Sequence, residues 1–216
     1  MLFNEDWVIK LQPIIDLYKT KKHPLNYKNQ YQLIIMVLLS AQDADVNINK
    51  IASSFFEKYP NFKSINQSTI EELSLYISKV KNYQIKASWV INISQQIIDE
   101  ENIPMNLKNL TALKGIGRKS ANVILREFNK PAEGIICDLH VIRVSSRIGL
   151  VSESKNGDKI EKELMQRLPY SIWNEIGMSL SFLGRETCRP IPKCEICPIK
   201  KDCKYYLIIK TKKPNQ

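Results

Sequence analysis

Two glycines one residue apart, Gly115 and Gly117, stand between two segments with the apolar spacing of helices. Leu110 and Leu113 close the first segment. The second shows one buried helix face, with apolar residues at Ala121, Ile124, Leu125 and Phe128. Glycine permits a positive φ and a close approach of another group, and Ile116 between the two can fill a core position. The stretch predicts a tight hairpin that leads directly into a helix.

The helix after the hairpin offers a place for a phosphate. Its first amide N–H groups have no partner inside the helix, and the helix dipole adds a partial positive charge at this end. On spacing alone, however, a Gly-x-Gly stretch more often marks only a tight connection between two helices.

Lys119 adds chemistry to this stretch, because it falls in the first turn of the expected helix. The dipole disfavours an ammonium there, and an uncharged amine in a pocket can attack a sugar or carbonyl carbon to give a Schiff base. The alternative is a surface lysine that touches phosphate as a plain cation, since most lysines are solvated. Lys119 is therefore the candidate nucleophile.

The rest of the chain shows the spacing of helices and no strand-like alternation of any length, so we expect an all-α fold. Asp6 should cap a first helix, and residues 29–40 should form a second that is apolar nearly all round and therefore enclosed. Asp45 should cap a third helix, and Ser68 with Glu71 should form a capping box for another. A stripe of residues four apart predicts the buried face of a longer helix: Ile85, Trp89, Ile93 and Ile97.

Two polar residues at helix ends are candidates for ligand contact. Gln42 lies on the corner after the second helix, from which it could reach into a nucleic-acid groove, although a solvated helix-end glutamine is more common. Asp138 follows the apolar run 135–137 and precedes a helical pattern. It is expected to be an N-cap, worth about 1 kcal/mol. It is also a carboxylate that could stabilise positive charge on a sugar ring or activate an attacking group.

The net charge of +10 and the pI near 9.3 favour a polyanionic partner. From Arg185 onward nine Lys and Arg residues stand against three acids, so more than half of the excess is C-terminal, as in a nucleic-acid footprint. The N-terminus has no signal-peptide pattern, and the longest apolar run, Leu33–Leu39, has seven residues, too few for a membrane span. We expect an intracellular protein without membrane contact.

Four of the five cysteines fall within sixteen residues, as Cys-x5-Cys-x2-Cys-x5-Cys. This crowding suits a metal site in a reducing compartment better than disulfides. Four thiolates can bind zinc or a [4Fe–4S] cluster, and a single Cys-x2-Cys with one flanking cysteine on each side favours the cluster. Lys193, Lys200 and Lys201 lie in or beside this loop and could contact a phosphate backbone. The expected ligands are Cys188, Cys194, Cys197 and Cys203.

Several motifs together resemble the endonuclease III branch of the helix–hairpin–helix DNA glycosylases. The likeness runs from about Tyr31 to Cys203 through motifs of the same order and separation: 38–42 (Leu-Leu-Ser-Ala-Gln), 113–123 (the hairpin and Lys119), 138–144 (Asp-Leu-His-Val-Ile-Arg-Val), Gly184-Arg185 and the four cysteines. The resemblance implies two helical domains with a DNA lesion bound between them. Residues 24–134 would be a six-helix barrel with the hairpin, and residues 1–23 with 135–216 would carry the cluster loop, 188–203.

By the same resemblance, Lys119 attacks C1′ of the damaged nucleotide, expels the base and forms a Schiff base that leads to β-elimination. Asp138 matches the family's carboxylate, and Gln42 matches the residue that fills the gap left by the flipped nucleotide. The expected DNA-binding residues are Gln42, Gly115, Ile116, Gly117, Arg118, Lys193, Lys200 and Lys201.

The implied function is that of a bifunctional DNA glycosylase and abasic-site lyase that acts, as a monomer, on oxidised pyrimidines or abasic sites in double-stranded DNA. A monofunctional glycosylase for another base and a non-catalytic DNA-binding hairpin module are the alternatives. The chain departs from the family pattern at Asn82, Lys114 and Leu139 and in the five-residue first cysteine gap, where six is usual. None of these departures removes a catalytic group.

Overall fold

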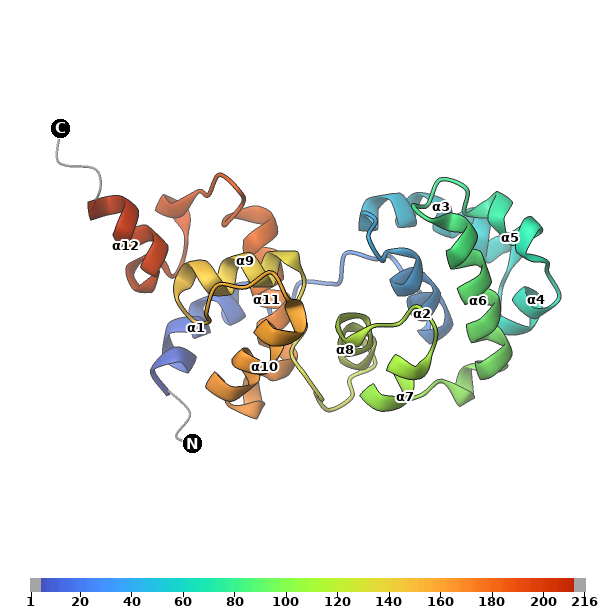
Figure 1. Cartoon of the computed structure of the whole chain (residues 1–216), viewed down its shortest axis with the longest axis horizontal. Helices are drawn as coiled ribbons and strands as arrows, with labels where there is room; N and C mark the ends of the chain where they lie inside the picture. Colours follow the sequence, from blue (N-terminus) through green and yellow to red (C-terminus); the bar gives the residue numbers. More distant parts are fainter. Residues whose placement is uncertain (1–4, 212–216) are drawn as a thin grey trace. The chain divides into compact units, whose positions relative to one another are not determined.

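A computed structural model describes residues 5–211, and within them it contains helices and no β-strand (Figure 1). The all-α fold expected from the apolar spacing is thereby confirmed. The chain divides into two compact units. The hairpin unit is Lys22–Lys130, and the cysteine unit contains the described residues up to Lys21 and from Pro131 onward. Within the described part, no helix is long and apolar enough to cross a membrane.

The hairpin unit is built around α2 (Gln30–Leu39), which packs against three other helices of the unit. Every residue of α2 from Leu33 to Leu39 is buried, as its all-round apolar sequence predicted. Asn29 caps the helix by accepting a hydrogen bond of 2.9 Å from the amide of Gln32. Its neighbours are α3 (Asp45–Lys58), α6 (Tyr83–Ile97) and α8 (Arg118–Glu127), and the remaining helices are α4 (Phe62–Asn66), α5 (Ile70–Tyr76), η1 (Glu100–Asn102) and α7 (Leu107–Ala112).

Two expected helix starts are corrected by one residue. Ala44, not Asp45, is the N-cap of α3, and Asp45 is the first helical residue. The capping box of α5 is made by Thr69 and Glu72, which exchange hydrogen bonds of 3.2 and 3.0 Å, and not by Ser68 and Glu71. At α5 two neighbouring residues, Ser68 and Thr69, both have side chains of capping type. At α3 the N-cap is an alanine that makes no side-chain capping bond, so the sequence favoured the aspartate beside it.

Two further expectations are settled at the ends of other helices. Ile85 is 50% exposed and Trp89 is half-buried, so the predicted buried stripe of α6 holds only at Ile93 and Ile97. Asp6 lies inside α1, which begins at Glu5, and forms an ion pair with Lys10 instead of capping the helix.

The cysteine unit is organised around α11 (Trp173–Glu186), whose residues from Ile176 to Gly184 are all buried. It packs against α9 (Leu139–Ile148) and α1 (Glu5–Tyr18). A Cβ at Gly184 would lie 2.7 Å from the Cβ of His140, so the glycine allows α11 to lie directly against α9. The other elements are α10 (Gly157–Arg167), η2 (Tyr170–Ile172), η3 (Cys194–Ile196), η4 (Lys200–Asp202) and α12 (Lys204–Thr211).

Candidate functional site

The hairpin between α7 and α8 depends on the first of its two glycines. Gly115 has a φ of +90°, and a Cβ there would lie 2.5 Å from Cε3 of Trp89. Ile116 is buried and donates a backbone hydrogen bond of 3.1 Å to the carbonyl of Leu113, so it holds the hairpin to the core. Gly117 differs, because it is extended and open space surrounds the position of its absent Cβ. A large group can therefore approach the backbone at Gly117.

Lys119 is the second residue of α8 and is half-buried. The N-cap of this helix is Gly117, which has no side chain to bind the first amide groups. The hairpin thus presents backbone donors and the positive end of a helix dipole beside a lysine, as an anion site requires.

His23 lies within electrostatic range of Lys119 and belongs to a group of ionisable side chains in the hairpin unit. Burial lowers the pKa of His23 to about 4, the carboxylate of Glu127 opposes this shift, and Lys119 adds to it. The Nδ1 atom of His23 accepts a hydrogen bond of 3.1 Å from the Leu25 amide, which fits a neutral imidazole. Tyr27 Oη donates to Glu127 Oε2 over 2.6 Å. The sequence gives no signal for this group, because no spacing rule connects residues about one hundred positions apart.

Gln42 is exposed in the turn between α2 and α3, with a φ of +59°. The left-handed region is uncommon for a residue other than glycine and costs free energy. The structure thus places the predicted groove-probing side chain at a helix end, in a conformation that its neighbours must hold.

Asp138, in the cysteine unit, is the N-cap of α9 as predicted. Its Oδ1 atom accepts hydrogen bonds from the amides of His140 and Val141, at 2.8 and 2.9 Å. Its Oδ2 atom accepts a hydrogen bond of 2.6 Å from Ser181 Oγ, and a terminal nitrogen of Arg185 lies 3.7 Å away. The side chain of Asp138 is 14% exposed. Donors therefore surround both oxygens and stabilise the negative charge.

The contribution of Ser181 was not foreseen. Serine on a buried helix face gives no signal of its own, and its partner lies forty-three positions away. Arg185 had been noted only as part of a family motif, and its Nε donates to Ser181 Oγ over 3.3 Å. Lys119 and Asp138, the two predicted catalytic residues, belong to different units of the chain.

The four cysteines of the C-terminal loop line one pocket, whose wall also includes Ile148, Leu183 and Pro192. Burial raises the pKa of the Cys197 thiol to about 11. Among the described residues, no three His, Cys, Asp or Glu side chains stand close enough to hold a single metal ion. The loop is tied to α9, because the guanidinium of Arg147 donates to the Arg189 carbonyl over 2.7 Å.

The predicted basic contacts of this loop differ in what surrounds them. Lys193 and Lys201 are exposed. Lys200 is half-buried, and its Nζ donates over 2.7 Å to the carbonyl of Glu195 within the same loop.

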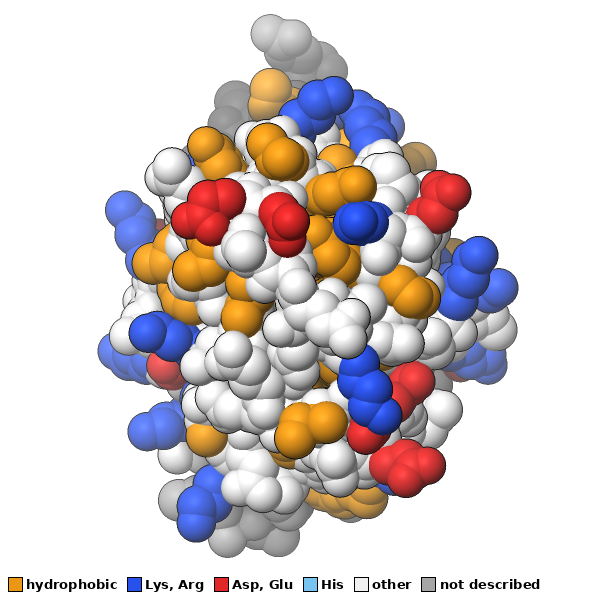
Figure 2. Space-filling model, turned by 90° about the vertical axis from the view of Figure 1, so that its right-hand side faces the viewer, with side chains coloured by type: hydrophobic (Ala, Val, Ile, Leu, Met, Phe, Trp, Pro, Cys, Tyr) orange, Lys and Arg blue, Asp and Glu red, His pale blue; other side chains and the backbone are white. Residues whose placement is uncertain are grey.

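The face of the hairpin unit formed at α4 and α5 shows no basic patch. Figure 2, seen from the side where these helices are labelled in Figure 1, shows hydrophobic side chains mixed with both signs of charge and no concentration of Lys and Arg at the centre.

Comparisons with known proteins agree with this arrangement. A family model described as HhH-GPD superfamily base excision DNA repair protein matches residues 35–170. Endonuclease III of Rickettsia felis is 35% identical over 189 residues, which cover 86% of this chain and 87% of that protein. Endonuclease III of Bacillus subtilis is 32% identical over 198 residues, which cover 90% of each.

Solved structures give the same result. A trapped covalent intermediate of endonuclease III with DNA is similar to this chain with a TM-score of 0.86 and 30% identity, over 97% of this chain and all of that one. A non-covalent endonuclease III–DNA complex has the same TM-score and 31% identity, over 99% of this chain and all of that one. A thermostable thymine-DNA glycosylase has a TM-score of 0.81 at 21% identity, which supports the fold alone.

Proposed function

Since this chain belongs to the endonuclease III family of the HhH-GPD superfamily, and is a base excision repair DNA glycosylase and abasic-site lyase, we propose that Lys119 is its nucleophile and that oxidised pyrimidines in duplex DNA are its substrates. The observation that carries the proposal is the position of Lys119. It is half-buried in the first turn of α8, directly after the Gly115–Gly117 hairpin and its amide donors.

The proposed reaction needs only an uncharged lysine amine and a proton acceptor. Nζ of Lys119 attacks C1′ of the extruded nucleotide, the bond from C1′ to the base breaks, and the base leaves with the electron pair and takes up a proton. Opening of the sugar ring at O4′ gives the Schiff base. Removal of a C2′ proton then expels the 3′ phosphate, and the strand is cut on that side of the abasic site.

Asp138 is proposed to stabilise positive charge on the sugar ring as the base departs. Its fixed orientation supports this role, because each oxygen has donors from a different part of the cysteine unit. A carboxylate that does not reorganise during the reaction stabilises a developing charge more than a mobile one.

The DNA contacts are proposed on the same physical grounds. The hairpin of Gly115, Ile116 and Gly117 would bind a phosphate of the lesion strand through the amides of its two glycines, with Ile116 holding the hairpin in place through its bond to Leu113 and Arg118 beside them. Gln42 would occupy the space that the flipped nucleotide leaves in the duplex. Lys193, Lys200 and Lys201 would contact the phosphate backbone without reading sequence.

The cysteine pocket fits a [4Fe–4S] cluster held by Cys188, Cys194, Cys197 and Cys203. Each thiolate of such a cluster binds a different iron, so the four sulfurs need not meet at one point, whereas a single zinc requires that they do. All four cysteines line this one pocket, which supports a group that they share. When bound, the cluster supplies a rigid cross-link that orders the basic loop. We further propose a monomer that acts inside the cell, where its DNA substrate is.

Borohydride reduction tests the role of Lys119. The wild-type protein mixed with a duplex that carries thymine glycol or an abasic site should give a stable covalent adduct. Lys119→Gln should give none while still binding the duplex, because only the amine is lost. Base release by the wild-type protein without any adduct would instead indicate a monofunctional glycosylase. Binding with neither base release nor adduct would indicate a non-catalytic hairpin module.

A further inference from the structure

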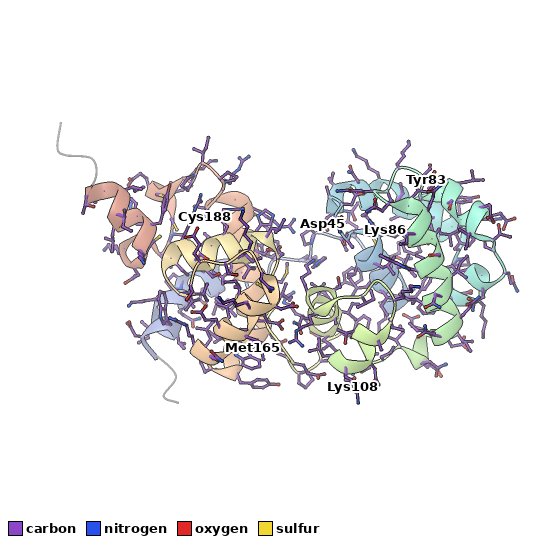
Figure 3. The ribbon with its side chains drawn as sticks, viewed as in Figure 1. Asp45, Tyr83, Lys86, Lys108, Met165 and Cys188 are labelled. Atoms are coloured by element: carbon purple, nitrogen blue, oxygen red, sulfur yellow. The ribbon has the colours of Figure 1, made fainter. Side chains whose placement is uncertain are left out.

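Lys86, in α6, is 2% exposed although its side chain carries an ammonium group (Figure 3). Its Nζ atom donates hydrogen bonds of 2.7 Å to the carbonyl oxygens of both Leu39 and Ala41. Burial lowers the pKa of Lys86, and the nearby carboxylate of Asp43 opposes that shift. An enclosed ammonium is costly unless its donors are satisfied. The two carbonyls that accept hydrogen bonds from the Lys86 ammonium belong to the turn after α2. The side chain of Lys86 therefore holds this turn in place.

This turn carries Gln42. The last carbonyls of an α-helix have no partner inside the helix, and Leu39 is the final residue of α2. Lys86 binds the carbonyls of Leu39 and Ala41, so it fixes the chain on the side through which α2 enters the turn. Gln42 follows at once, exposed and with a φ of +59°. Such a conformation persists only where neighbouring groups determine it.

Asp43 fixes the chain on the other side of Gln42. Its Oδ2 atom accepts a hydrogen bond of 2.7 Å from the Lys81 amide, in the segment just before α6. Its Oδ1 atom accepts hydrogen bonds from the Ala44 amide and from Asn47 Nδ2, at 2.7 and 3.0 Å. Gln42 therefore stands between two residues that α6 and the segment before it hold in place.

We propose that Lys86 is a positioning residue for Gln42. The buried ammonium holds the turn in the left-handed conformation that presents the Gln42 amide to the duplex, at the place of the extruded nucleotide. This inference rests on the role proposed above for Gln42. Lys86→Met removes the buried charge and keeps much of the side-chain volume, but it leaves the carbonyls of Leu39 and Ala41 without this donor. The free energy of unfolding should therefore fall, and the turn loses the group that binds its carbonyls.

A double-mutant cycle tests the proposal with Lys86→Met, Gln42→Ala and the double variant. The measurements are the dissociation constants for a duplex with a stable abasic-site analogue and for the undamaged duplex. Each single variant should bind the abasic duplex about tenfold more weakly, and the double variant should be no weaker than Gln42→Ala, because both changes remove one interaction. Affinity for the undamaged duplex should stay unchanged. Ser94→Ala is the matched control, since Ser94 is buried in the same helix but its hydroxyl donates only to Val90.

The outcomes separate this inference from the proposed function. Additive losses, an equal loss on undamaged DNA, or an unaffected Lys86→Met variant would overturn the role of Lys86. The same cycle with Asp43→Ala, at a half-exposed position, releases the other side of the turn and should show the same non-additivity even if Lys86→Met does not fold. Additivity there would also overturn the proposal. A wild-type protein without preference for the abasic duplex would overturn the proposed function itself, and this inference with it.

Discussion

Ser181 Oγ lies 2.6 Å from Asp138 Oδ2 and donates a hydrogen bond to it, so the middle of α11 is tied to the carboxylate that precedes α9. The other oxygen of Asp138 is already bound by two backbone amides at the start of α9. Ser181 is fully buried, so no water can replace its hydroxyl. The orientation of the proposed catalytic carboxylate thus depends on one serine of a different helix.

Ser181→Ala should slow base excision. A hydrogen bond to a charged group contributes about 1.5–3 kcal/mol, so an excision rate about ten- to a hundredfold lower is expected in single-turnover assays. Affinity for the abasic duplex should change little. Ser179→Ala is the control, because Ser179 is also buried in α11. Equal losses in the two variants would show that packing of α11, and not the bond to Asp138, sets the rate.

The two hairpin glycines should respond differently to alanine. Gly115→Ala requires a Cβ at a φ of +90° and 2.5 Å from Trp89, so we expect a loss of about 2 kcal/mol or more in the free energy of unfolding. Gly117→Ala has open space and ordinary backbone angles, and it replaces only a weak N-cap, so stability should fall by no more than about 1 kcal/mol. Its new methyl group should nevertheless weaken DNA binding, where the backbone meets the phosphate. Urea unfolding and duplex titration measure both effects. A stable Gly115→Ala variant would contradict the strain argument.

His23 should make the protein less stable in mild acid. Its pKa is lowered from 6.5 to about 4, so below pH 6.5 the unfolded chain binds a proton that the native imidazole does not bind until about pH 4. Stability is therefore lost as the pH falls through this window. Between pH 7 and pH 5 the wild-type protein should lose about 2 kcal/mol more than His23→Asn, which keeps an acceptor for the Leu25 amide. Identical pH profiles in urea unfolding would exclude a buried neutral His23.

The purified protein should be yellow-brown and contain iron. Cys203→Ala should lose the colour and most of the iron, because it removes one of four ligands from the cluster. Cys137→Ala should keep both, since Cys137 is buried outside the pocket of the other four cysteines. Absorbance and metal analysis provide the measurements. Stoichiometric zinc without iron would contradict the proposed cluster.

The exposed lysines of the cysteine loop should contribute to affinity without adding specificity. Replacing both Lys193 and Lys201 with alanine should weaken binding to damaged and undamaged duplexes alike. It should also lower the slope of log affinity against log salt by about one to two, because each phosphate contact releases counterions. Lys200→Ala should affect the slope less, since its ammonium is already bound to Glu195. A loss confined to the damaged duplex would place these lysines at the lesion instead.

The sequence was sufficient where local rules decide the structure. The all-round apolar α2, its ends at Asn29 and Ser40, and the cap at Asp138 follow from apolar spacing and capping chemistry within a few residues. The motif spacing and the family resemblance also pointed to Lys119 and the cysteine loop, whose roles stay predictions.

The buried face of α6 shows why other details were missed. Residues four apart advance 40° beyond a full turn at each step, so a strict four-residue stripe leaves the buried face after three steps. The buried face instead contains Lys86, Val90, Ile93 and Ile97, at spacings of four, three and four, with Ala87 and Ser94 beside them. Lys86 stands among these buried positions, and a lysine there was the sequence feature that could have indicated a buried functional group. The bond between Ser181 and Asp138 had no such signal, because only tertiary packing brings the two side chains together.

The enclosure of α2 limits how this protein can change. A helix without a solvent-facing side has few neutral positions, since a substitution at almost any residue from Leu33 to Leu39 alters packing against several neighbouring helices. Substitutions in this part of the chain that alter DNA contacts without loss of stability are therefore expected in the loops at the two ends of α2. The segment from Leu33 to Leu39 is expected to stay the same in variants whose lesion preference changes through those loops.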